Sequence, residues 1–282
     1  MRKLKANLLN ILHCPEDNGS LKLKDEKFDS NDRIFSGNLI CEKCKKRYKI
    51  FDRVPCFVND QGYVENFGFQ WEKHSRTQLD NEVDYNEETF FSVTGLKKNE
   101  IKGKLFLDVG CGKGRFSIFI QKYGGEVVGI DLSSSVYQAN QNLGNNSNAN
   151  FLQANINKLP FKEYSFDYIF SIGVLHHTPD PKKSFLCLIP YLKRGGSISI
   201  CVYNKGAFLY EWSKRLRKYS TKMKRTTLYF LCRVACRLLY PIFKLPILKL
   251  FIYYIPIDMN PNYDWRLLTT FDAYSPKYAQ RT

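Results

Sequence analysis

Residues 105–120 read LFLDVGCGKGRFSIFI, and this stretch decides the fold. Its first five residues are a short apolar run that predicts a buried strand. Gly110, Gly112 and Gly114 follow at once, and a segment with helical spacing of apolar residues comes next. Glycines let the backbone turn sharply and approach a ligand at a helix N-terminus, where unpaired N–H groups point outward. The stretch therefore predicts a strand–turn–helix unit with a ligand site at the turn.

From Lys104 onward the chain continues as a regular alternation of apolar runs and amphipathic segments. Such alternation is typical of βαβ units and a parallel sheet, so we expect an α/β, Rossmann-like doubly wound sheet. The predicted strands are residues 105–109, 126–130, 150–153, 166–172 and 197–203, and the predicted helices are residues 115–123, 133–142 and 181–192.

Two carboxylates flank the glycine turn. Asp131 ends the second strand, where it can accept hydrogen bonds from both ribose hydroxyls of a nucleoside, or else serve as a helix N-cap. One residue separates Gly112 from Gly114, whereas a dinucleotide fingerprint has two at that place. Asp108 precedes the first glycine, where it would face a pyrophosphate poorly but suits a cationic amino-acid group. These features favour S-adenosylmethionine over a nicotinamide dinucleotide.

Four segments resemble, in order, the motifs of class I S-adenosylmethionine-dependent methyltransferases: LFLDVGCGKGRFSIFI, VVGIDLSS, LQANINKLPFKEYSFDYIFSIGVLHHTPDP and LKRGGSISI. The resemblance covers about residues 67–203 and implies a sheet of order 3-2-1-4-5-7-6. It also implies that the cofactor binds at the loop that ends with Gly114. Asp108, Gly110 and Gly112 would then line the methionine, and Asp131 would hold the ribose.

The resemblance further implies the adenine side of the site. Asn155 stands where the family usually has an Asp that accepts from the adenine amino group, and the Asn carbonyl oxygen can accept as well. Leu132 and Ile156 would sandwich the adenine, although bare apolar residues are equally expected in a core. Gln70 and Trp71 resemble a segment that covers the cofactor, with plain packing as the alternative.

His176 and His177 follow the fourth predicted strand and are candidate catalytic residues. Imidazole has a pKa suited to a general base, which methyl transfer needs only if the acceptor must lose a proton. The alternative is that both rings orient the loop by hydrogen bonding. Of the two, His176 is the better candidate for the active-site side.

The cysteine pattern near the start resembles a zinc ribbon. Cys14-Pro-Glu-Asp17 and Cys41-Glu-Lys-Cys44 resemble the small zinc-ribbon protein that activates several methyltransferases, here fused to the enzyme. Three thiolates and the Asp17 carboxylate can form a tetrahedral zinc site. A metal-free ribbon held by packing is the alternative. Further candidate ligands are Cys56 and His13.

The net charge of +16 is concentrated in one segment, because residues 205–250 hold 12 Lys or Arg and a single acidic residue. The segment is also apolar, but charges and prolines interrupt every run of the length that a transmembrane span needs. Arg225, Arg233 and Arg237 lie at multiples of four and predict a basic stripe on a helix. Such a helix can lie at an anionic membrane, cover the pocket of an anionic or lipid-like acceptor, or pack on its own domain.

We expect four regions along the 282 residues. They are a zinc-ribbon-like β module (1–60), a helical cap or linker over the cofactor site (61–103), the methyltransferase core (104–204), and a mainly helical, basic and apolar lid segment with an incomplete C-terminal end (205–282). Residues 259–282 are predicted to be loop-like from their Pro, Asp and Asn content. The antiparallel strand 6–7 hairpin that closes family sheets is then expected to be missing or incomplete, with an exposed sheet edge.

The predicted function is a methyltransferase that acts on a small-molecule acceptor, such as a sugar, a lipid or a specialised metabolite. An RNA or protein methyltransferase and a catalytically silent binding module on the same fold are the alternatives. Nucleic acid is the less favoured partner, because the sequence lacks the N/D-P-P-[FYW] motif of methyltransferases that act on base amines. Nine scattered cysteines and no visible signal peptide predict a cytoplasmic protein, with peripheral membrane contact as a further expectation.

Overall fold

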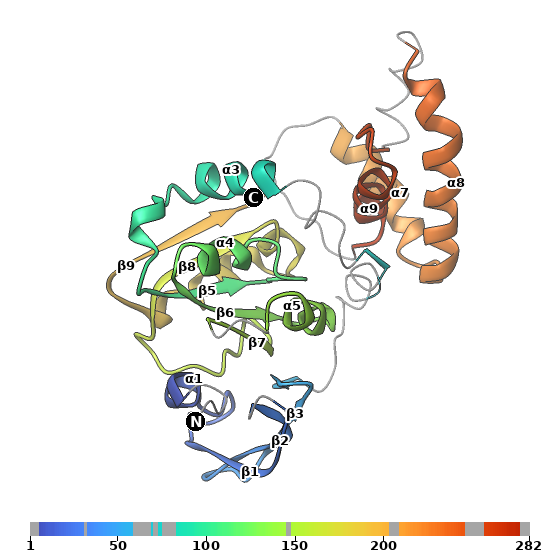
Figure 1. The fold of residues 1–282 in the computed structure, drawn as a ribbon. Coiled ribbons are helices and arrows are strands. Elements are labelled where there is room, and N and C mark those ends of the chain that lie inside the picture. The colour runs from blue at the N-terminus through green and yellow to red at the C-terminus, as the bar shows by residue number, and fades with distance from the viewer. Residues whose placement is uncertain are drawn as a thin grey trace.

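The computed structural model describes residues 6–30, 33–58, 69, 73–74, 83–144, 148–202, 209–245 and 257–276. Figure 1 shows three parts: a small N-terminal sheet, a central α/β layer structure, and a group of helices beside it. Gln70 and Trp71 lie outside the described residues, so their predicted role stays a prediction.

The central sheet is parallel and has the order β7-β6-β5-β8-β9. Its strands are β5 (Leu105–Val109), β6 (Glu126–Asp131), β7 (Ala149–Gln153), β8 (Phe166–Ile172) and β9 (Leu192–Cys201). In chain order this is 3-2-1-4-5, which confirms the predicted Rossmann-like fold. The described residues add no sixth or seventh strand to this sheet, and β9 forms one of its edges.

Both faces of the sheet are covered. Phe106 points to a core shared with α3 (Val83–Thr94), α4 (Ser117–Lys122) and α5 (Ser135–Leu143). Leu107 and Val109 belong to a second core, which also takes in the N-terminal module. Because side chains alternate along a strand, one five-residue run supplies both cores.

The predicted helix over residues 181–192 is shorter in the structure. Helix α6 covers Pro181–Leu186, and a 3-10 turn, η4 (Ile189–Tyr191), leads directly into β9. Pro190 lies within η4 and has no N–H to donate, so the α-helical ladder cannot continue through it.

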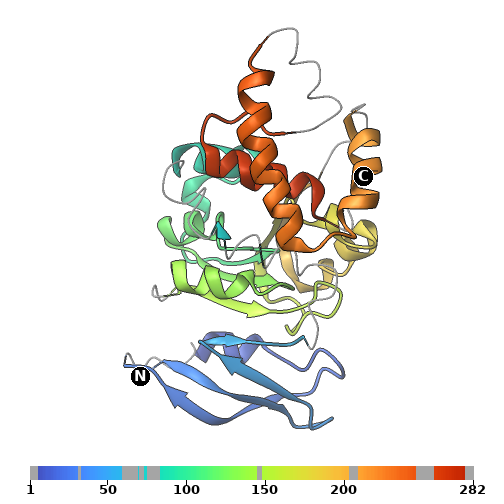
Figure 2. The same cartoon turned by 90° about the vertical axis from the view of Figure 1, so that its right-hand side faces the viewer.

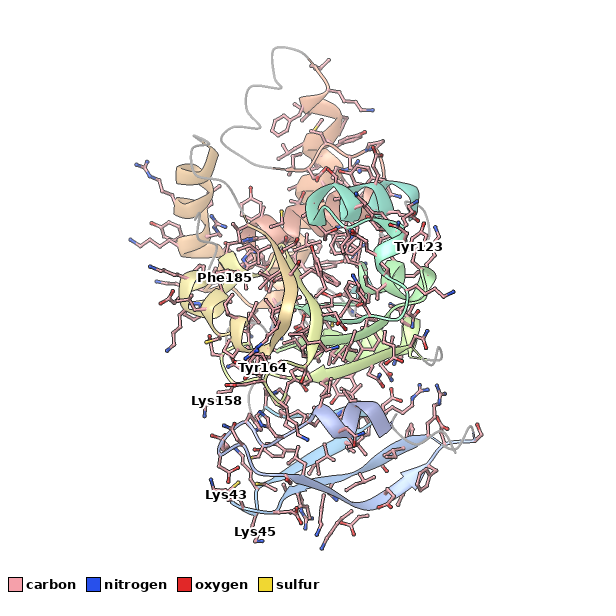
Figure 3. All side chains as sticks on the ribbon, turned by 90° about the vertical axis from the view of Figure 1, so that its left-hand side faces the viewer. Lys43, Lys45, Tyr123, Lys158, Tyr164 and Phe185 are labelled. Atoms are coloured by element: carbon pink, nitrogen blue, oxygen red, sulfur yellow. The ribbon has the colours of Figure 1, made fainter. Side chains whose placement is uncertain are left out.

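The N-terminal module is an antiparallel sheet of order β1-β2-β3-β4 preceded by α1 (Ala6–Ile11). Its strands are β1 (Leu21–Phe28), β2 (Ile34–Cys41), β3 (Arg47–Phe51) and β4 (Val54–Pro55). It joins the central domain through a bridge from Leu12 to Phe161 and an ion pair between Glu16 and Lys158 with N···O 2.8 Å. Figure 3 shows Lys158 at this border.

Helices α7 (Leu209–Ser220), α8 (Arg225–Phe243), and α9 (Tyr263–Tyr274) form the third part. The prediction of a loop over residues 259–282 is wrong for Tyr263–Tyr274, which form α9. The Asn262 side chain accepts the Trp265 N–H at 3.1 Å and caps the helix, so a residue counted as a loop signal begins a helix. Leu267 and Phe271 are buried against Leu228 and its neighbours on α8, which holds α9 in place.

We expect Phe271→Ala to lower the free energy of unfolding by about 3–5 kcal/mol, because it empties a fully buried site between α8 and α9. Urea unfolding followed by circular dichroism measures the change. Leu186→Ala, at a position that is 54% exposed, is the matched control and should cost about 0.5 kcal/mol or less. Equal losses in the two variants would contradict the packing of α9 described above.

Candidate functional site

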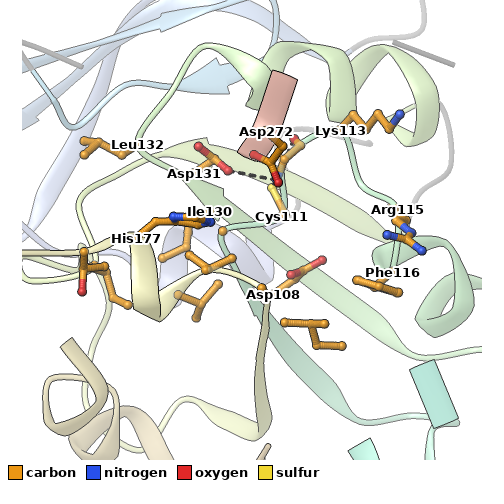
Figure 4. A pocket seen from close by; sticks show the side chains of 18 of the residues that line it. Asp108, Cys111, Lys113, Arg115, Phe116, Ile130, Asp131, Leu132, His177 and Asp272 are labelled. Carbon is orange, nitrogen blue, oxygen red and sulfur yellow. Dashed lines mark hydrogen bonds between the residues drawn. The ribbon is translucent and has the colours of Figure 1, made fainter. Parts of the chain in front are cut away.

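A cavity of about 350 Å³ lies at the carboxyl ends of β5, β6 and β8 (Figure 4). Its walls come from the ends of these strands, the glycine loop, the loop after β8 and helix α9. In a doubly wound sheet this is where ligands bind. The cavity also has the size of a small-molecule site.

The glycine loop can take its shape only with glycines. Gly110 has φ +76° and a Cβ there would lie 2.4 Å from the Val174 side chain. Gly114 has φ +86° and a Cβ there would lie 2.7 Å from Leu143. The N–H groups of Gly110 and Cys111 both donate to the carbonyl oxygen of Ile130, at 2.8 and 2.9 Å. The loop is thereby held against the end of β6.

Asp131 joins the two sides of this loop. Its Oδ2 accepts the Gly112 N–H at 2.9 Å, and its Oδ1 accepts the N–H and hydroxyl of Ser133 at 2.8 and 2.7 Å. None of these donors belongs to α5, which begins at Ser135, so these three bonds do not cap that helix. Asp131 also lines the cavity, and its contact with a ribose stays a prediction.

Asp108 is a buried carboxyl at the floor of the cavity. Its Oδ2 accepts the Ser117 hydroxyl at 2.6 Å. Burial and, to a smaller extent, the negative charge of Asp131 raise the pKa of Asp108 to about 7, although the Ser117 hydrogen bond acts in the opposite direction. A cation beside this group would favour the ionised form, so the site suits a positively charged ligand group.

Of the three residues predicted to contact the adenine, two line the cavity and one does not. Leu132 and Ile156 line the cavity, as expected. Asn155 is not among the residues lining the cavity, and its Oδ1 accepts the Asn157 N–H at 2.9 Å in a local turn. The adenine-binding roles of these residues stay predictions.

The preference for His176 on the active-site side is wrong. His177 lines the cavity, whereas His176 is fully buried behind it, with the two Nε2 atoms 3.0 Å apart. Burial lowers the pKa of His176 to about 3, so this ring is neutral near pH 7. Both residues lie in the 3-10 turn η3 (Leu175–His177), and their ring centroids are 4.1 Å apart, but only the His177 ring lines the cavity.

Sequence reasoning missed the residues that come from the helices. Thr89 of α3 lines the cavity, as do Leu268, Thr269 and Asp272 of α9. The Asp272 Oδ1 is buried, and no hydrogen-bond partner for it is found in the part of the chain that the structure describes. Burial raises the pKa of Asp272, while the neighbouring His177 and Arg217 act in the opposite direction. Spacing along the chain could have indicated a helix here, but only tertiary packing brings Asp272 to the cavity.

A second cluster lies in the N-terminal module, where ligand atoms of Cys14, Asp17, Cys41 and Cys44 are all within 4.8 Å of one another. The Cys14 and Cys44 Sγ atoms are 3.6 Å apart. Two thiolates on one tetrahedral zinc would be about 3.8 Å apart, given Zn–S bonds of about 2.3 Å. The separation of these two thiols is therefore compatible with a shared zinc ion, and the other two predicted ligands, Asp17 and Cys41, lie in the same cluster. Neither Cys56 nor His13 belongs to this cluster of described residues.

Backbone N–H groups point at two of the clustered ligands, Cys41 and Asp17. The N–H groups of Lys43 and Cys44 point at the Cys41 Sγ, at 3.3 and 3.4 Å. The Gly19 N–H donates to the Asp17 Oδ1 at 2.9 Å. This hydrogen bond is the main reason why the pKa of Asp17 is lowered to about 2. Ligands held in this way suit a divalent cation.

Comparisons with known proteins agree with both parts of this description. Residues 107–200 match the family described as Methyltransferase domain, and residues 5–52 match the family described as Trm112p-like protein. The ubiquinone biosynthesis O-methyltransferase of Coxiella burnetii is 33% identical over 114 residues, which cover 39% of this chain and 49% of that protein. Phosphoethanolamine N-methyltransferase 1 of Zea mays is 33% identical over 112 residues, covering 39% and 22%. The chain thus spans about half the length, or less, of these relatives.

Solved structures with a similar fold include an S-adenosylmethionine-dependent methyltransferase from Mesorhizobium loti, with a TM-score of 0.38, 24% identity, and coverage of 47% of this chain and 57% of that one. Another is a chain from a complex that contains the Trm112 methyltransferase activator of Haloferax volcanii, with a TM-score of 0.44, 19% identity, and coverage of 54% and 66%. From its matched segments and the order of its strands, this chain carries a class I S-adenosylmethionine-dependent methyltransferase domain, preceded by a Trm112p-like module that resembles a zinc ribbon.

Proposed function

We propose that this chain transfers a methyl group from S-adenosylmethionine to a small-molecule acceptor that binds beneath α9. The observation that carries the proposal is that Leu268, Thr269 and Asp272 of α9 line the same cavity as Asp108 and Asp131. Methyl transfer is an in-line displacement at the sulfonium carbon, so the protein mainly aligns the acceptor and excludes water. A site covered by a helix suits a small acceptor better than a folded macromolecule.

On the cofactor side, several predicted contacts have a physical basis. The buried Asp108 favours a cation, which the methionine ammonium supplies, and Asp131 offers its carboxylate to the ribose. Leu132 and Ile156 provide apolar walls for the adenine. Asn155 does not line the cavity, so the structure lends no support to its predicted contact with the adenine amino group.

On the acceptor side, Phe116, Val174 and Leu268 form apolar walls, and His177 and Asp272 are two of the polar groups. A carboxylate and an imidazole can accept the proton of a hydroxyl or an amine that attacks the methyl group. We therefore propose an acceptor with such a group on an otherwise apolar body. Whether a proton must leave before or during attack depends on the acceptor.

The N-terminal module is proposed to support the methyltransferase domain within the same chain. It contributes Leu12 and Ile34 to the core that lies under β5, and the Cys56 thiol donates to the Gln153 Oε1 at 3.3 Å. We also propose that its cysteine cluster holds one zinc ion, which would fix the loops of the module.

An RNA or protein acceptor remains the alternative function, favoured by the Trm112p-like module and the basic segment.

Asp131→Ala should weaken S-adenosylmethionine binding at least about 100-fold, because two hydrogen bonds to a charged group contribute about 1.5–3 kcal/mol each. Isothermal titration calorimetry measures the affinity. Asp25→Ala, an exposed Asp of β1, is the control and should bind as the parent does. Unchanged affinity in the Asp131 variant would contradict the assignment of the site.

Asp272→Asn should lower turnover about 100-fold, as loss of a general base does, while S-adenosylmethionine affinity stays within about twofold. Turnover is followed as S-adenosylhomocysteine formed with a panel of small hydroxyl and amine acceptors. Asp264→Asn, at an exposed position in the first turn of α9, is the matched control. A loss of cofactor affinity equal to the loss of turnover would instead assign Asp272 to the cofactor.

Protein purified without chelator should contain about one zinc ion per chain, and Cys44→Ala should reduce this content strongly. Elemental mass spectrometry gives the ratio. Cys187→Ala, at a cysteine outside the cluster, should keep the parent's zinc content. Folded parent protein with almost no zinc would identify the module as a metal-free ribbon.

A further inference from the structure

Helix α8 has an apolar face that no described residue covers. The face toward α9 holds the buried residues Leu228, Cys232 and Cys236. Six further apolar side chains on or just after α8 are exposed, Phe230 and Leu238 by 60% and 61%. They are Phe230, Leu231, Val234, Leu238, Ile242 and Leu245. Figures 1 and 2 show α8 on the outer side of α9, away from the central sheet.

These exposed apolar side chains form one continuous stripe. With about 100° of rotation per residue, the five that lie on α8 fall within a sector of about 120° that points away from the buried residues, and Leu245 follows just after the helix. Exposed apolar side chains scattered singly are ordinary on a protein surface, but a contiguous stripe marks an interaction site. The stripe, defined by the six residues named above, is called the outer face of α8 below.

Basic side chains border the outer face. Arg233, Arg237 and Lys244 are exposed and lie between the outer face and the face toward α9. Lys222 and Lys224 are exposed in the turn before the helix, and residues 209–245 hold ten Lys or Arg against one acidic residue. Arg225 does not join Arg233 in a stripe, since a step of eight residues turns the helix about 80° past full turns. The predicted basic stripe is therefore correct for Arg233 and Arg237 but wrong for Arg225.

By length and composition, α8 is also a helix that could cross a membrane. Its 19 residues would span about 28 Å, close to the thickness of a bilayer core. A membrane-spanning α8 would lose its contact with α9. It would also place Arg233 and Arg237 near the bilayer centre, where charges are costly. An orientation in the plane of the interface keeps both the α9 contact and the hydrated arginines.

We propose that the outer face of α8 docks on an anionic phospholipid bilayer, with the helix lying in the plane of the interface. Apolar side chains enter the acyl boundary, and the flanking Lys and Arg bind lipid phosphates, which is the design of interfacial amphipathic helices. A cytoplasmic enzyme bound in this way would be peripheral. Because α9 packs on the opposite side of α8 and lines the cavity, docking would bring the site near lipid-borne acceptors. The docking itself does not depend on methyl transfer.

The test is co-sedimentation of the full chain with vesicles of phosphatidylcholine alone, or with about one third phosphatidylglycerol. Binding is expected to the anionic vesicles and should weaken with salt. Leu231→Glu combined with Leu238→Glu should reduce affinity at least about tenfold, by removing buried apolar area. Lys222→Gln combined with Lys224→Gln should cost roughly fivefold for each lysine. Leu186→Glu on α6, 54% exposed, is the matched control and should bind as the parent does.

Three outcomes would overturn the proposal. The first is absence of binding by the parent to anionic vesicles. The second is a parent dimer, seen by light scattering, that the Leu231 and Leu238 changes dissociate while vesicles are not bound, which would make a second copy the occupant. The third is protein that stays in the vesicle pellet after alkaline carbonate, which would show a spanning helix. Cofactor affinity, measured on the same variants, should be unchanged, so failure here is distinguishable from failure of the proposed enzymatic function.

Discussion

The carboxylate of Asp131 is the contact on which the site depends. By accepting the Gly112 N–H at 2.9 Å, it ties the loop after β5 to the end of β6. The loop could not reach this position with other residues, because the backbone at Gly110 and Gly114 is left-handed and side chains would collide with Val174 and Leu143. Parallel pairing of β5 with β6 brings the two strand ends together, and the carboxylate then fixes the distance between them.

The central sheet could be predicted from the sequence because its signals are local. A buried parallel strand is a short apolar run bounded by breakers, and β5 and β8 begin and end where the runs do. Asp108, Asp131 and the glycines follow from the same local pattern. The exposed strand β1, with its alternating lysines, gave no such signal, since most of its side chains are in water.

What the sequence could not show is set by tertiary packing. Asp272 reaches the cavity only because α9 packs on α8, and the order of two adjacent histidines relative to the cavity depends on the turn that holds them. The helix α9 itself was missed because Asn262 was counted as a loop residue rather than a cap. Capping residues and loop residues are the same amino acids, so composition alone does not separate the start of a helix from a loop.

The missing side chain at Gly110 has a consequence for the spacing within the site. The space that its Cβ would occupy is filled by Val174, which directly precedes the turn that carries His177. The loop that would hold the cofactor and the loop that faces the acceptor are therefore in van der Waals contact across this glycine. At this contact the glycine loop limits how far the turn that carries His177 can approach it, so the spacing between the two sides of the cavity depends on a residue without a side chain.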